Sequence, residues 1–246
     1  MEVHAHTHTA RKKWTHYLWE FLMLFLAVFC GFLAEYQLEH MIEHQREKEF
    51  IKSMVEDLQD DHEKLNQYAL SLESGIKAMD TLINLLTDDE QLKENTSLVY
   101  YLARVAPRVS LFTSNNRTLE QLKNSGSFRL IRNNKASNKI IEYYSNFTFV
   151  DLLQNLFLRE FDEYKRIASK IFNPAVFKMM EKENGEISRQ ANSPSLRTTN
   201  PELLNEIGVY AVYMNGSRRS IVPAVEAQQK KGAELIVYLK TEYHLK

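Results

Sequence analysis

The chain has 246 residues, with 31 basic and 32 acidic side chains, so its formal net charge is -1. A nearly neutral chain offers no general electrostatic argument for binding nucleic acid. Only 7 glycines and 5 prolines are present, and this scarcity of helix breakers predicts an all-α fold. Cys30 is the single cysteine, so disulfides within the chain are excluded.

Residues 1–16 are predicted to form a disordered cytoplasmic tail, because they show no apolar periodicity. The tail contains alternating histidines, and imidazole nitrogens can bind soft or borderline divalent metals. A structural zinc site needs about four ligands on rigid elements, and Glu2 is the only nearby carboxylate. We therefore treat the tract as a weak metal candidate and expect no cofactor. The histidines concerned are His4, His6 and His8.

Residues 17–36 are predicted to form one transmembrane helix. An uncharged apolar run from Phe21 to Ala34 is flanked by aromatic residues, which favour the membrane interface. A helix needs roughly 20 apolar residues to cross a bilayer core. A cleavable signal peptide would need small residues before its cleavage site, whereas Phe32 and Leu33 precede Ala34. We therefore expect an uncleaved anchor rather than a signal peptide or a buried core helix.

The basic residues near this segment predict its orientation. Arg11, Lys12 and Lys13 precede the span, whereas the first basic residue after it is Arg46. Positively charged flanks usually stay in the cytoplasm. The N-terminus is therefore predicted to be cytoplasmic, with the remaining domain on the periplasmic or outer side and the lipid bilayer as a partner.

Glu20 lies within the predicted span, where carboxyl groups are costly and often functional. Helical spacing places it on one face with Ala27, Gly31 and Ala34, and small residues allow helices to approach closely. One hypothesis is that this face contacts a second copy or another membrane protein, with Glu20 protonated or paired there. The alternative is a carboxyl that reaches the membrane interface beside Lys13.

Residues 37–90 are predicted to form a long stalk helix that continues from the span. Apolar residues recur there at alternating steps of four and three, which is typical of a coiled coil or a long bundle helix. His62 occupies one of these positions, and we interpret it as a polar residue that sets register. The predicted seam comprises Ile51, Val55, Leu58, His62, Leu65, Ala69, Leu72, Ile76, Met79, Ile83 and Leu86.

Residues 91–246 are predicted to form a helical domain that packs with the stalk as an elongated antiparallel bundle. Thr96 is expected to start a short helix, which a loop over 109–116 follows. A capping-box pattern headed by Thr118 predicts another helix start.

The second half of this domain is predicted to contain two long helices. The first runs from Ser137 to Phe172, and a short helix over 175–183 follows. Residues 184–199 are polar and predicted to form a mobile loop. Asn200-Pro201-Glu202 predicts the start of the last helix, in which Pro223 marks a candidate kink.

Two oppositely charged groups of side chains allow three interpretations. The groups face each other when the domain folds back, or the basic group binds lipid headgroups, phosphate or an acidic partner, or both are solvated faces. The acidic band consists of Glu56, Asp57, Asp60, Asp61 and Glu63. The basic group consists of Arg117, Lys123, Arg129, Arg132, Lys135 and Lys139.

Three sequence segments resemble a group of uncharacterised single-span membrane proteins from Bacteroidota. They are EFLMLFLAVFCGFLAEYQLEH behind the histidine-containing tail, TLEQLKNSGSFRLIRN, and IIEYY. The resemblance covers both the predicted anchor and the domain, and it implies the inner membrane of a Gram-negative cell. It implies no activity and assigns no functional residue.

The sequence contains no phosphate loop, dinucleotide fingerprint, HExxH or CxxC motif, so we expect no enzyme and identify no small-molecule substrate. The predicted function is a membrane-anchored scaffold or sensor that acts through helix–helix and protein–protein contacts. Its binding residues are expected within 117–139 or around 184–200. The alternative, by analogy of topology, is an accessory subunit of an ion-driven envelope complex that uses Glu20.

Overall fold

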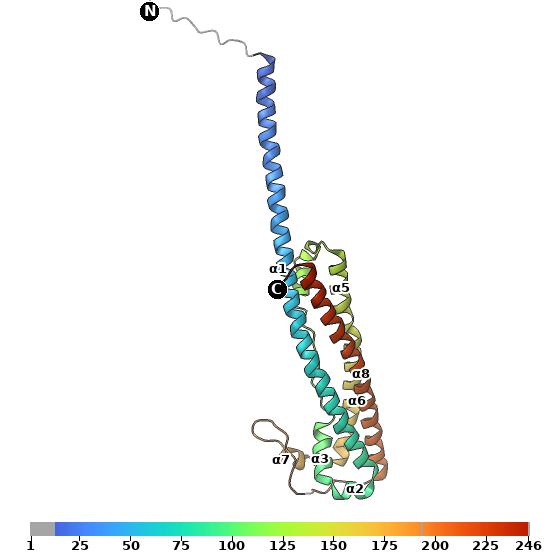
Figure 1. Ribbon diagram of the computed structural model, residues 1–246. Coiled ribbons are helices and arrows are strands. Elements are labelled where there is room, and N and C mark those ends of the chain that lie inside the picture. Colours follow the sequence, from blue (N-terminus) through green and yellow to red (C-terminus); the bar gives the residue numbers. More distant parts are fainter. Residues whose placement is uncertain (1–12, 193, 246) are drawn as a thin grey trace, which may run out of the picture. The chain divides into compact units, whose positions relative to one another are not determined.

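A computed structural model describes residues 13–192 and 194–245 of the chain (Figure 1). Within these ranges all regular elements are helices, and one isolated bridge joins Glu181 to Ile187. The prediction of an all-α fold is therefore confirmed. The chain divides into two compact units, the N-terminal unit (residues 1–50) and the bundle (residues 51–246), and each is described by itself.

Helix α1 (Trp14–Thr87) supplies residues to both units. It ends where the sequence predicts, because Asp88 accepts hydrogen bonds from the amides of Glu90 and Gln91 and so caps the next helix, α2 (Asp89–Glu94). The sequence analysis did not predict α2.

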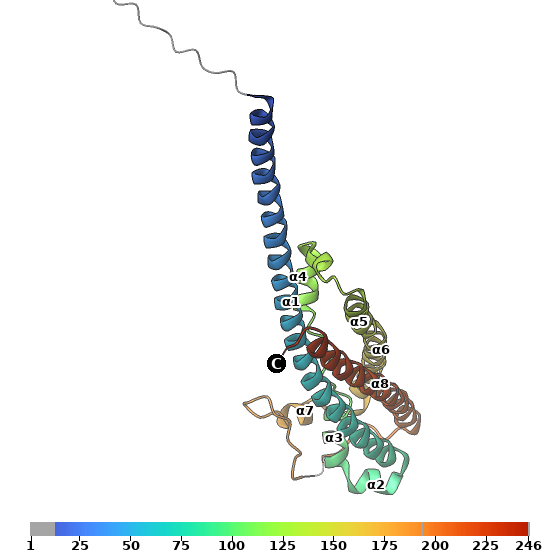
Figure 2. The ribbon, with the colours of Figure 1, turned by 45° about the horizontal axis from the view of Figure 1, so that its top comes forward.

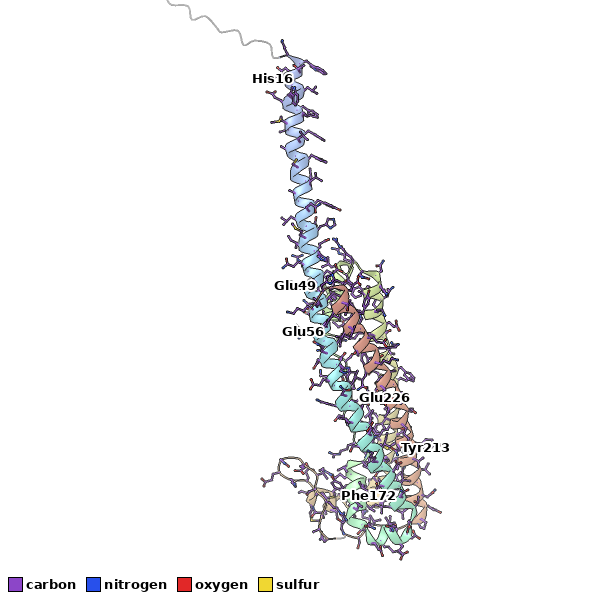
Figure 3. All side chains as sticks on the ribbon, viewed as in Figure 1. His16, Glu49, Glu56, Phe172, Tyr213 and Glu226 are labelled. Carbon is purple, nitrogen blue, oxygen red and sulfur yellow. The ribbon has the colours of Figure 1, made fainter. Side chains whose placement is uncertain are left out.

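In the N-terminal unit, the described side chains of the predicted span are not buried. Every residue from 13 to 39 is exposed, and Figure 3 shows side chains projecting on all sides of this part of α1. Among the described residues, α1 is the one helix with a stretch long and apolar enough to cross a membrane. A helix that is apolar all round requires an apolar environment, either a protein core or a lipid bilayer.

The bundle combines the later part of α1 with α5 (Asn134–Ser145), α6 (Phe147–Ile171) and α8 (Pro201–Glu242). Figures 1 and 2 show α6 and α8 side by side. Asn66 of α1 accepts a hydrogen bond from Gln229, and Asp80 accepts one from Asn215. Residue numbers therefore rise along α1 as they fall along α8, so these two helices are antiparallel.

The buried face of α1 in the bundle is wider than the predicted seam. Seven of the eleven predicted seam residues are buried, whereas His62, Ala69, Ile76 and Ile83 are only half-buried. A helix that packs against several neighbours buries a broader apolar stripe than a coiled-coil helix, which buries two positions in every seven. The additional buried apolar residues are Met54, Tyr68, Leu82 and Leu85.

The predicted single helix from Ser137 to Phe172 is wrong, because the structure contains α5 and α6 with a break at Asn146. Ser145 and Asn146 stand at this break. The Ser145 hydroxyl donates to the carbonyl of Glu142 at 3.0 Å, and such side-chain bonds to the backbone compete with helical hydrogen bonds.

Short elements connect the long helices. They are α3 (Thr96–Val105), α4 (Arg117–Asn124), the 3-10 helix η1 (Ser127–Leu130) and α7 (Pro174–Met179). Helix α7 ends earlier than predicted, before the bridge that joins Glu181 to Ile187.

Helix α8 is continuous through Pro223, and the side chain of Asn200 caps its N-terminus as the sequence predicts. Pro223 lacks the N–H that would bond the carbonyl of Arg219, four residues earlier. Both residues are exposed, so water can hydrate this carbonyl.

Candidate functional site

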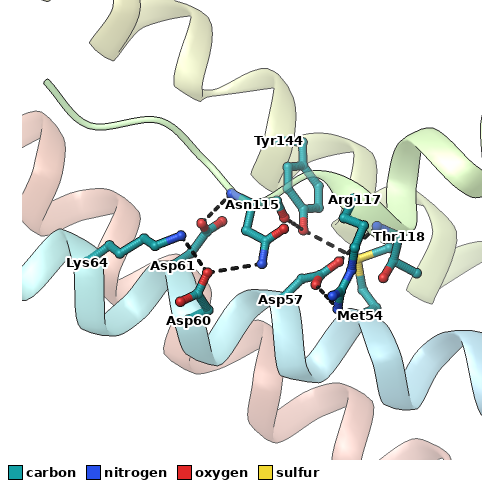
Figure 4. Close-up of polar contacts among 9 residues, drawn as sticks. All are labelled: Met54, Asp57, Asp60, Asp61, Lys64, Asn115, Arg117, Thr118 and Tyr144. Carbon is teal, nitrogen blue, oxygen red and sulfur yellow. Dashed lines mark hydrogen bonds and ion pairs between the residues drawn. The ribbon is translucent and has the colours of Figure 1, made fainter.

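A polar network in the bundle fastens the loop 106–116 and the start of α4 to α1 (Figure 4). Asp57 of α1 is buried, and its two carboxylate oxygens have different partners. One accepts the backbone N–H of Thr118 at 2.8 Å, and the other accepts a guanidinium N–H of Arg117 at 2.7 Å. A carboxylate distant in sequence therefore stabilises the N-terminal turn of α4.

This arrangement corrects the predicted capping box. Helix α4 begins at Arg117, and Asn116 at the cap position makes no side-chain cap hydrogen bond. Thr118 is the second helical residue rather than the cap. The first backbone N–H groups of a helix have no acceptor within the helix. The N–H of Thr118 is one of these, and it donates to the carboxylate of Asp57 instead.

Asp61 lies one turn further along α1 and is also buried. Its carboxylate accepts the backbone N–H of Asn115 and, at 3.3 Å, the hydroxyl of Tyr143. Burial raises the pKa of Asp61 to about 6, although these hydrogen bonds oppose the change. The Asp61 carboxyl therefore keeps its proton to a higher pH than an exposed aspartate does.

Asp60, the neighbouring residue, behaves in the opposite way. It forms an ion pair with Lys64 at 2.6 Å and accepts the side-chain amide of Asn115 at 3.0 Å. The hydrogen bond from Lys64 is the main reason that the pKa of Asp60 is lowered. The pKa values of two adjacent carboxyls thus shift in opposite directions, because burial dominates at Asp61 and the hydrogen bond from Lys64 dominates at Asp60.

Two tyrosines of α5 complete the network from the other side. The hydroxyl of Tyr144 donates to the backbone carbonyl of Asn115 at 3.1 Å and lies 3.4 Å from the sulfur of Met54. Burial raises the pKa values of Tyr143 and Tyr144, so both remain hydrogen-bond donors. The network holds a loop between two helices, and it presents no nucleophile with a paired base.

The structure brings one member of the basic group to the acidic band, through the ion pair between Arg117 and Asp57. Lys123 pairs with Glu120 of its own helix at 3.7 Å, and Arg129 is exposed. The remaining contacts of the group lie elsewhere on the bundle.

Lys135 and Lys139 lie over the ring of Tyr238 on α8, at 5.5 and 5.4 Å from its centroid. Arg132 also has interaction partners. The basic group is therefore distributed over several local contacts.

In the N-terminal unit, the Glu20 carboxylate lies 3.0 Å from Nε2 of His16, which belongs to the preceding helical turn. The small residues predicted to share its face are exposed, and a methyl group added at Gly31 would meet no atom within 4 Å. The other two are Ala27 and Ala34. The described part of the chain therefore leaves this face uncovered.

The predicted metal candidates His4, His6 and His8 lie outside the described residues. Within residues 13–192 and 194–245, no group of three or more His, Cys, Asp or Glu side chains is arranged to hold a metal ion. His62 is half-buried in the bundle, and its Nδ1 atom has no hydrogen-bond partner in the described structure.

The sequence analysis missed Arg218 of α8, which is almost fully buried. Its guanidinium donates to the backbone carbonyls of Gly75, Ala106 and Arg108 and lies 4.9 Å from the ring centroid of Phe157. Burial lowers the pKa of Arg218 to about 10. Cations near the last carbonyls of a helix are stabilising, so Arg218 fixes the turn that follows α3.

Comparisons with known protein families, curated proteins and solved structures found no match to this chain. The functional argument therefore rests on the geometry of the two units.

Proposed function

We propose that the chain is a single-pass, membrane-anchored helical scaffold or sensor whose bundle lies in the periplasm. One observation carries this proposal: residues 13–39 are all exposed although the stretch is rich in Phe and Leu. Water does not stabilise such a surface, whereas a bilayer does, and the helix satisfies its own backbone hydrogen bonds.

The direction of insertion follows from charge. Arg11, Lys12 and Lys13 before the span favour a cytoplasmic N-terminus. The resemblance of the anchor segment to single-span Bacteroidota proteins supports the inner membrane of a Gram-negative cell.

A role in protein contacts is supported by an apolar stripe on α6. Phe149, Leu152 and Leu156 are spaced by three and four residues, and their exposed fractions are 57, 58 and 38%. Adjacent exposed apolar side chains often mark interaction sites on soluble domains. Scaffolding or sensing therefore suits the bundle better than catalysis by the polar network, which lacks a nucleophile paired with a base.

Membrane fractionation combined with C-terminal reporters tests this proposal. The full chain should sediment with membranes, resist an alkaline wash and require detergent for extraction. A periplasm-dependent alkaline phosphatase fused after the C-terminus should be active, whereas a fluorescent reporter that folds only in the cytoplasm should be dark. A freely soluble chain, or the reverse reporter pattern, would contradict the proposal.

A second candidate function is an accessory subunit of an ion-driven envelope complex. The contact between His16 and Glu20 supports it, because a carboxylate and an imidazole within hydrogen-bond distance can exchange a proton. In a deletion strain, Glu20→Gln should be expressed normally yet fail to restore growth, while Glu35→Gln, at the other end of the span, restores it. Full restoration by Glu20→Gln would reject this candidate.

A further inference from the structure

A cavity of about 380 Å³ lies in the bundle between α3, the C-terminal half of α6, α7 and the segment before α8. Phe172, one of its lining residues, is labelled in Figure 3 at the end of the bundle that contains α3 and α7. Cavities that bind small molecules typically enclose about 300–1,000 Å³. This volume therefore suits a compact organic ligand.

One wall of the cavity is aromatic and rigidly packed. The rings of Phe172 and Phe177 stack with centroids 5.4 Å apart, and Tyr100 meets both edge-on at 5.2 and 5.8 Å. Tyr164 is buried beside them and donates its hydroxyl to the carbonyl of Ala103 at 3.2 Å. A preformed flat surface of this kind favours an aromatic or flat apolar group.

The polar lining is positively charged, and no acidic residue belongs to it. Arg104 pairs with Glu181 at 2.7 Å, and Lys165 pairs with Asp162 at 2.6 Å, so two of the cations have carboxylate partners nearby. The Nε atom of Arg104 is nevertheless buried without a hydrogen-bond partner in the described structure. The four lining cations are Arg104, Arg108, Lys165 and Arg197.

The other two cations lack a carboxylate partner within the described residues. Both are held at fixed points by their backbones: the carbonyl of Arg108 accepts from buried Arg218 at 2.8 Å, and the amide of Arg197 donates to Ile171 at 2.9 Å. Arg197 also donates from its side chain to the carbonyl of Ser169 at 3.2 Å. The backbones that carry these two cations are therefore held at the cavity, and the side chain of Arg197 is held there as well.

We propose that this cavity binds a small organic anion with a flat apolar body and a carboxylate or phosphate head. The head would interact with Arg108 and Arg197, and the body would lie against the half-buried ring of Phe177, against which buried Phe172 stacks. Guanidinium groups recognise such heads through charge-assisted hydrogen bonds, and the aromatic wall supplies apolar contact area. The site requires nothing from the membrane segment, so its failure and the failure of the proposed anchoring are separate results.

The test uses the full chain in nanodiscs of neutral phosphatidylcholine and follows two probes by fluorine NMR. The probes are para-trifluoromethyl-benzoate and the matched neutral para-trifluoromethyl-benzyl alcohol. We expect saturable binding of the benzoate, at least about tenfold tighter than binding of the alcohol, because a hydrogen bond to a charged group contributes that much.

Variants locate the binding. Arg108→Gln and Arg197→Gln should each weaken benzoate binding about tenfold. Ser169→Trp, at an exposed position that lines the cavity, should block it without removing charge. Arg159→Gln is the matched control, because Arg159 is an exposed cation of α6 outside the cavity. Circular dichroism during heating verifies that each variant is folded.

Three results would overturn the inference: no saturable binding of the benzoate, equal binding of the alcohol, or a loss in Arg159→Gln as large as in the cavity variants. If a folded Ser169→Trp chain binds the benzoate normally, the binding site lies elsewhere and the proposal is also rejected.

Discussion

Two stretches of α1 show opposite relations between polarity and burial. Residues 17–36 are mostly apolar and entirely exposed, whereas residues 51–87 bury an apolar face together with the carboxylates of Asp57 and Asp61. Burial therefore depends on the groups that surround a side chain as well as on its own polarity. An apolar face without protein partners points to lipid, and a carboxylate with suitable donors can be placed inside a bundle.

The largest expected effect is on the exposed stretch. Phe25→Lys combined with Phe29→Lys should prevent insertion, because each charge near the centre of a span costs about 2.5–3.5 kcal/mol or more. The variant should therefore be absent from the membrane pellet after an alkaline wash. Glu56→Lys with Glu63→Lys places two lysines at exposed positions of the bundle and should stay in the pellet. Retention of the double Phe variant in the pellet would show that the exposed apolar stretch is not what holds the chain in the membrane.

The second effect concerns apolar side chains on the same helix. Leu72 is fully buried, so Leu72→Ala should lower the free energy of unfolding of the bundle by about 2–5 kcal/mol. Leu26→Ala, in the exposed stretch, should leave the unfolding of the bundle nearly unchanged. Thermal unfolding by circular dichroism measures both variants. Equal losses would show that the two stretches do not differ as described.

The third effect tests the buried carboxyl. The folded pKa of Asp61, about 6, lies above its ordinary value of 3.8, so the folded state binds more protons between these pH values. Protonated Asp61 therefore stabilises the folded state. This contribution is complete below the ordinary pKa of 3.8 and is lost as the pH rises through the folded pKa of about 6. Relative to Asp61→Asn, the wild-type free energy of unfolding should fall by roughly 2 kcal/mol between about pH 4 and pH 7.

Urea unfolding at several pH values measures this change. Asp60→Asn is the control, because the lowered pKa of Asp60 has the opposite sign. Asp60 contributes stability above its ordinary pKa and loses it as the pH falls through the folded value. The free energy of unfolding of the wild type is compared with that of Asp61→Asn and with that of Asp60→Asn. If both differences change with pH in the same direction, burial does not govern the pKa of Asp61.

The smallest effect compares two glycines of α1. A methyl group at Gly75 would lie 2.9 Å from the guanidinium carbon of Arg218, whereas one at Gly31 would meet no atom within 4 Å. Gly75→Ala should therefore destabilise the bundle by about 1–3 kcal/mol, as overpacking does. Gly31→Ala should be neutral or favourable, because alanine is the better helix former. Thermal unfolding compares them, and a neutral Gly75→Ala would show that Arg218 can move away.

Local patterns predicted the features that depend on neighbouring residues. The uncharged run from Phe21 to Ala34 indicated the exposed apolar stretch, and Asn200-Pro201 indicated the start of α8. The end of α1 before Asp88 was also predicted correctly. These features involve hydrogen bonds or side-chain spacing within about one or two helical turns, which a sequence displays directly.

The tertiary structure decided which polar groups are buried and which cations meet. Asp57 stabilises the first turn of a helix about sixty residues later in the chain, and Arg218 reaches the turn after α3. The acidic band gave no sign of which carboxyls would be enclosed, and nothing in the pattern joined Arg108 to Arg197. A sequence shows what each side chain can bind, but the donors, acceptors and rings that surround it are brought together only when distant segments pack.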